Sequence, residues 1–140
     1  MKNFDQQAAF DDAVRGIIKQ GGPSVGGSNR KAQFCRYRGD GDTACAIGQL
    51  IPDTKYSPEM EGQGIEGHFS GVTAMIDDKY GCALRRDLEF LSDLQCAHDS
   101  AERHSDNNEE FLAEFVSAAK DVALKHLLSS SVAHLEEGAE

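Results

Sequence analysis

Three long stretches of the chain place apolar residues at the spacing of one helical face, and this periodicity constrains the fold more than any other feature of the sequence. They cover residues 3–20, 83–103 and 108–129, and a shorter stripe covers residues 71–80. We therefore expect three long helices that pack their apolar faces together. The centre of the predicted core consists of six side chains: Leu84, Leu88, Leu91, Phe111, Phe115 and Val122.

A segment between the first two long helices has the pattern of a β-hairpin. Residues 33–38 and 43–47 are short extended runs, separated by the turn formers Gly39-Asp-Gly-Asp42. A three-residue loop would place Cys35 opposite Cys45. The predicted fold class is therefore α+β and mainly helical, with three long helices packed against a small β-hairpin.

The length of 140 residues indicates a single domain over residues 1–140, because a second core would leave each half too small to bury itself well. Residues 21–31 are rich in Gly and Ser and predict a flexible loop, and residues 130–140 predict a frayed tail. No apolar run approaches the roughly 18 residues of a membrane span, and the first residues lack the apolar region of a signal peptide. We expect a cytoplasmic protein that does not contact membranes.

Acidic residues outnumber basic ones by 24 to 14, and the net charge of −10 makes direct nucleic-acid binding unexpected. The charge is most concentrated in residues 99–114, where six acidic residues and one basic residue give −5. We expect these six to contact a host protein with a basic surface, although such a run can also be a solvated helix face. Replacing Glu109 and Glu110 by Lys should then slow association without disturbing the fold. The six residues are Asp99, Glu102, Asp106, Glu109, Glu110 and Glu114.

Cys45, His98 and Asp99 offer a different hypothesis, a small cysteine-dependent enzyme. A helix that starts at Cys45 would lower the pKa of its thiol, with His98 as the base and Asp99 as its orienter. Neighbouring residues of a helix point about 100° apart, which would make Asp99 a poor orienter of His98. Alternatively, Arg36 and Arg38 would line a polar ligand pocket with Cys45 and His98.

Metal and cofactor motifs are weak in this sequence. Zinc bound by Cys35 and Cys45 with Cys96 or His98 is an alternative to structural thiols, but these cysteines lack a Cys-x-x-Cys knuckle. The segment Gly62-Gln-Gly-Ile-Glu-Gly67 has the letters of a dinucleotide fingerprint without a preceding strand. We therefore expect neither a metal nor a cofactor.

Parts of the sequence resemble a known group of proteins. Over residues 33–128 the chain resembles small uncharacterised proteins encoded by phages, prophages and bacteria. It is also similar to a more distant bacterial group that has an aromatic-Asn-Asp triplet where this chain has Ala97-His-Asp99. The resemblance implies a small, mainly helical domain of mobile-element origin, and it implies no reaction. Four segments carry it: Cys35-Arg-Tyr-Arg-Gly39, Cys45-Ala-Ile-Gly-Gln-Leu-Ile-Pro-Asp53, Tyr56-Ser-Pro-Glu-Met-Glu-Gly62 and Leu94-Gln-Cys-Ala-His-Asp99.

Two functional hypotheses follow from the sequence. The first is a non-enzymatic acidic binding protein of phage or mobile-element origin that inhibits a host nucleic-acid-handling or defence factor, as anti-CRISPR or anti-restriction proteins do. The alternative is a small Cys/His-dependent enzyme or a small-ligand-binding module. A pocket around Cys45 and His98 would favour the alternative, and a flat acidic face would favour the first hypothesis. The oligomeric state is left open, including a homo-oligomer.

Overall fold

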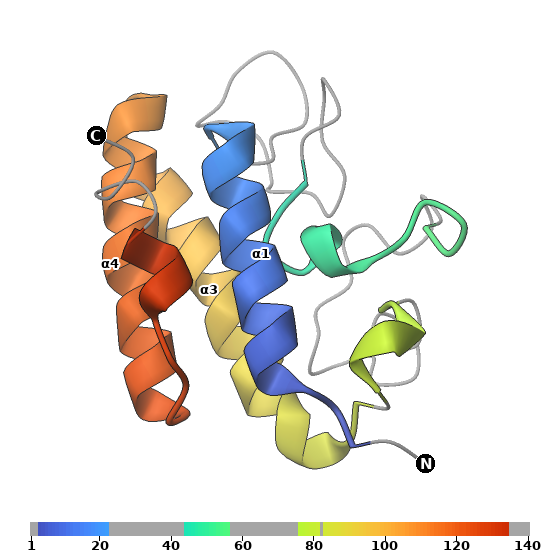
Figure 1. Cartoon of the computed structure of the whole chain (residues 1–140). Helices are drawn as coiled ribbons and strands as arrows, with labels where there is room; N and C mark the ends of the chain where they lie inside the picture. Colours follow the sequence, from blue (N-terminus) through green and yellow to red (C-terminus); the bar gives the residue numbers. More distant parts are fainter. Residues whose placement is uncertain (1–2, 23–43, 57–75, 82, 135–140) are drawn as a thin grey trace.

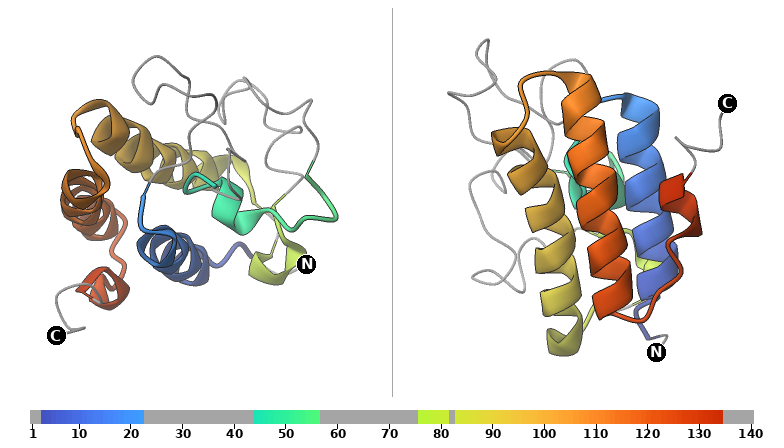
Figure 2. Two further views of the ribbon diagram at one scale, coloured as in Figure 1. Left: turned by 90° about the horizontal axis from the view of Figure 1, so that it is seen from above. Right: turned by 90° about the vertical axis from the view of Figure 1, so that its left-hand side faces the viewer.

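Three helices form the frame of the protein. The computed structural model describes residues 3–22, 44–56, 76–81 and 83–134. α1 and α3 run in the same direction, and α4 runs in the opposite direction and packs against both (Figures 1 and 2). The periodicity thus predicted all three helices. Their bounds are α1 Gln6–Gln20, α3 Leu88–Arg103 and α4 Asn108–Lys125.

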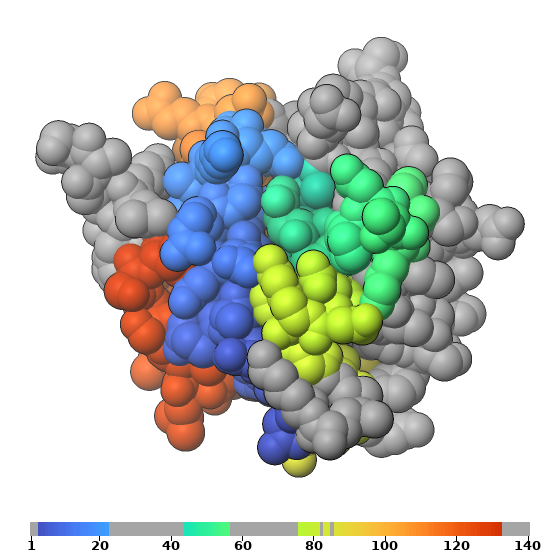
Figure 3. All heavy atoms as spheres, turned by 45° about the vertical axis from the view of Figure 1, so that its right-hand side comes forward, coloured from blue at the N-terminus to red at the C-terminus, as the bar shows by residue number. Residues whose placement is uncertain are grey.

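Short 3-10 helices occupy parts of the connections between the long helices and part of the segment after α4. Residues 44–56 and 76–81, which contain the first two of them, lie against the same side of α1 (Figure 3). Within the described residues, no helix combines the length and the apolar character needed to cross a membrane. The 3-10 helices are η3 Gly48–Leu50, η6 Asp78–Tyr80, η7 Arg85–Asp87 and η8 Ser131–His134.

The structure corrects the predicted fold class, because the described residues form helices and turns and contain no β-strand. In the predicted second strand of the hairpin, Ala44 forms an isolated bridge and the chain turns at Ala46 and Ile47 into η3. Consecutive residues from Ala44 to Gly48 are buried, whereas a half-exposed strand would alternate between two faces. The predicted first strand and Cys35 lie outside the described residues.

The ends of the helices are set by capping groups that the periodicity does not detect. α1 starts after Asp5 and not at Asn3, because an Asp5 side-chain oxygen accepts the Ala8 N–H at 3.0 Å. α1 ends at Gln20, and its C-cap Gly21 has a φ of 82°, in the left-handed region. Of the shorter apolar stripe over residues 71–80, residues 71–75 lie outside the described residues, and within residues 76–80 only η6 is helical.

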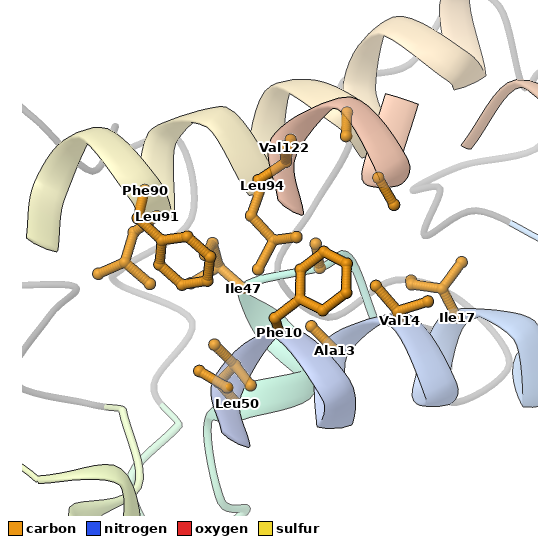
Figure 4. Close-up of a cluster of buried hydrophobic side chains, with 14 of the residues drawn as sticks. Phe10, Ala13, Val14, Ile17, Ile47, Leu50, Phe90, Leu91, Leu94 and Val122 are labelled. Carbon is orange, nitrogen blue, oxygen red and sulfur yellow. The ribbon is translucent and has the colours of Figure 1, made fainter. Parts of the chain in front are cut away.

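The core lies where the three helices and η3 converge. Phe10 from α1, Leu94 from α3 and Ile47 beside η3 point into the same buried space (Figure 4). Of the six side chains predicted at the core centre, five are buried, but Leu84 is 40% exposed. Leu84 precedes η7 and α3, so the helical spacing that would turn it inward does not apply to it.

Two glutamines tie the segment around η3 to α1. Gln20 Oε1 accepts the Ala44 N–H at 2.8 Å and Gln20 Nε2 donates to the Ala44 carbonyl at 3.1 Å, as a neighbouring strand would. Gln49 Nε2 donates to Gln20 Oε1 and to the Ala44 carbonyl, each at 3.1 Å. A Cβ atom on Gly16 would collide with Gln49 Oε1 and lie 2.7 Å from Cδ, so glycine permits this close approach.

Candidate functional site

The start of α4 is fixed by two side-chain caps. Asn107 is extended, with φ −150° and ψ 173°, and its Oδ1 accepts the Glu110 N–H at 2.8 Å. Glu110 Oε1 in turn accepts the Asp106 N–H at 2.8 Å. This reciprocal arrangement is close to a capping box, in which a helix's first donors are satisfied by side chains. It ties the carboxylate of Glu110 to the backbone just before α4.

Four of the six predicted contact residues are exposed in this region: Asp106, Glu109, Glu110 and Glu114. At about 1.5 Å per residue, Glu114 lies about 9 Å along the helix axis from its first residue. The four carboxylates are therefore gathered at one end of the pair formed by α3 and α4, and we call these four residues the acidic surface.

The other two predicted contact residues are placed differently by α3. The side chain of Asp99 is 30% exposed. Glu102 is only 3% exposed, so its side chain does not belong to the contact surface in this structure. Leu94, His98 and Glu102 follow one another at i, i+4 spacing, so they share the buried face of α3. This spacing is present in the sequence, but the charge of Glu102 made a surface position the expected one.

The acidic surface differs in its electrostatic surroundings from those carboxylates that form ion pairs. Asp12 lies 3.3 Å from Arg15, and Asp93 lies 2.9 Å from Lys125. The three glutamates of the acidic surface form no ion pair within the part of the chain that the structure describes. The partial positive charge at the start of α4 offsets part of their charge, and that effect is confined to the first turn.

Cys45 is placed at the start of a helical turn, as the enzyme hypothesis requires, but its thiol is fully buried. Its Sγ accepts the Gly48 N–H at 3.3 Å. Burial raises the pKa of the Cys45 thiol to about 12, and the hydrogen bond from Gly48 lowers it only in part. The thiol is therefore protonated at neutral pH, whereas a nucleophilic cysteine needs the thiolate.

His98 and Asp99 are hydrogen-bonded, contrary to our expectation from helix geometry. His98 is fully buried, and its Nδ1 lies 3.0 Å from Asp99 Oδ1. The divergence of about 100° applies to the Cα–Cβ directions and does not fix where the ends of the side chains lie. The edge of the His98 ring also packs on Phe111, with ring centroids 5.4 Å apart. His98 is thus held between the two helices.

Gln95, for which the sequence predicts no role, completes this cluster. Its Nε2 donates to Asp99 Oδ1 at 2.9 Å, and its Oε1 accepts the Ile47 N–H at 3.1 Å. The signal in the sequence is the i, i+4 spacing of Gln95 and Asp99, a pair that commonly forms a hydrogen bond on a helix. The cluster joins α3 to the segment that leads into η3.

The structure does not assemble the alternative zinc site in its described part. Cys45 is buried while Cys96 is exposed on α3. Among the described residues, no group of three His, Cys, Asp or Glu side chains is placed to hold a metal ion. Cys35 and the predicted pocket residues Arg36 and Arg38 lie outside the described residues.

Comparison of the chain with protein-family models, curated proteins and solved structures gives no match. The function must therefore be inferred from the chemistry of the described residues.

Proposed function

We propose that this protein is a binding protein that docks through its acidic surface onto a partner with a basic surface. The observation that carries the proposal is the absence of ion pairs for the three glutamates of the acidic surface within the described residues. Carboxylates that are exposed and uncompensated present a negative potential to an approaching partner. Such a potential accelerates encounter and is screened over about 8 Å at physiological salt.

The chemistry that fits this surface is that of a protein which itself binds nucleic acid, because such proteins present clustered Lys and Arg. Masking those residues would block access of nucleic acid to them. In the proposed role, a chain of phage or other mobile-element origin inhibits a host nucleic-acid-handling or defence factor by this competition. The role requires neither a thiolate at Cys45 nor a cofactor.

The test must separate the charge of the acidic surface from the stability of α4. Replacing Glu110 by Lys would remove the acceptor for the Asp106 N–H, so the pair Glu109 and Glu110 is unsuitable. Glu109→Gln combined with Glu114→Gln keeps both capping bonds and raises the net charge by two. The matched control is Asp121→Lys, which also raises the charge by two at an exposed position nearer the other end of α4.

Tagged wild-type protein and both variants are used to capture proteins from a host lysate, and captured partners are then measured by surface plasmon resonance at several salt concentrations. We expect a basic partner whose association with the Glu109/Glu114 variant is at least several-fold slower and less dependent on salt. The Asp121 variant should behave as the wild type. Equal rates and equal salt dependence for all three proteins, or capture of no specific partner, would contradict the proposal.

A further inference from the structure

We draw no further inference here: the strongest candidate, the exposed apolar patch of Leu124 and Leu127 at the C-terminal end of α4, carries nothing because nothing in the structure shows what covers it.

Discussion

The two ends of α4 differ in how well their residues suit the local backbone conformation. At the start, Asn107 and Glu110 satisfy backbone donors, and acidic side chains lie near the positive end of the helix dipole. At the other end Leu127, which is 91% exposed, has a φ of 59° at a position where glycine is usual. The start therefore agrees with local chemical preferences, whereas the end contradicts them.

Backbone hydrogen bonds identify the end of α4 as a Schellman motif. The Leu128 N–H donates to the Ala123 carbonyl at 2.8 Å, and the Leu127 N–H donates to the Leu124 carbonyl at 3.3 Å. This motif requires a left-handed residue, and for leucine that conformation costs about 1–2 kcal/mol. Leu128 packs against the core, which helps to keep the chain in this turn despite the strain.

Contacts with α3 also hold the end of α4. His126 Nε2 lies 2.8 Å from Asp93 Oδ2, and Lys125 Nζ lies 2.9 Å from the same oxygen. The His126 ring packs edge-on against Phe90, with ring centroids 5.4 Å apart. Local capping thus defines one end of this helix, and tertiary contacts define the other.

The largest expected effect on the free energy of unfolding comes from the difference in burial between side chains at the two ends of α4. Phe111, in the first turn of α4, is fully buried, whereas Leu124 near the last turn is 77% exposed. Phe111→Ala should lower the free energy of unfolding by about 3–5 kcal/mol, because it leaves a cavity beside His98 and Phe115. Leu124→Ala should change it by less than about 0.5 kcal/mol. Urea denaturation measures both, and similar losses would show that α4 is rotated from the orientation described.

Removing the cap at the start of α4 should have the next largest effect. Asn107→Ala is expected to cost about 1 kcal/mol in urea denaturation, because the Glu110 N–H loses its acceptor. Asn107→Asp retains a side-chain oxygen at this position and should restore most of the stability. If the Ala and Asp variants unfold at the same urea concentration, the side-chain cap does not stabilise the helix.

Relieving the strain at the other end should stabilise the protein. Leu127→Gly is expected to raise the free energy of unfolding by roughly 0.5–1 kcal/mol, since glycine adopts a positive φ freely but loses more backbone entropy on folding. Leu127→Ala keeps the strain while shortening the exposed side chain, so it serves as the control and should have little effect. A Gly variant no more stable than the Ala variant would show that the leucine backbone is not strained.

The smallest effect on stability should appear at acidic pH, and it depends on the contacts of Asp93. Burial alone would raise the pKa of Asp93, but hydrogen bonds from His126 and Lys125 outweigh it and hold this pKa below its ordinary value of 3.8. A carboxyl with a lowered pKa in the folded state contributes stability above its unfolded pKa, and this contribution is lost as the pH falls through the folded value.

Wild-type protein should therefore lose more stability between about pH 5 and pH 2 than Asp93→Asn, which lacks the titrating group. Thermal melts across this range measure the difference. Asp121→Asn, at an exposed position of α4, is the control and should follow the wild-type curve. Parallel curves for the wild type and the Asp93 variant would show that the contacts of Asp93 do not stabilise the end of α4.

The sequence predicted the three helices because their apolar stripes are long. The prediction was wrong in a short segment whose residue types suit either a strand or a buried turn. Ala46 and Ile47 suit an extended strand by residue type, but both are buried in the turn before η3. The predicted end of α4 near residue 129 was also too late, because apolar spacing continues through Leu127 although the backbone has already left the helix. Apolar periodicity predicts which face of a helix is buried, but it does not predict where the helix ends.

The candidate site was predictable only in part. The concentration of charge around Glu109 and Glu114 was evident from the sequence, and the structure places both residues on the surface. The burial of Glu102 and the hydrogen bonds of Gln95 depend on which face of α3 meets the rest of the molecule. Tertiary packing decides which face of α3 is buried, and the charge pattern alone does not predict it.

The glycine that lets Gln49 approach α1 has a consequence for the order in which the chain folds. Gly16 lies within α1, where glycine weakens an isolated helix by about 1 kcal/mol relative to alanine, and a single helix of this length is already marginal in water. The compensating contact comes from a later segment, through the bonds that Gln20 and Gln49 make around Ala44. On a ribosome, α1 should therefore acquire persistent order only after residues 44–50 have emerged.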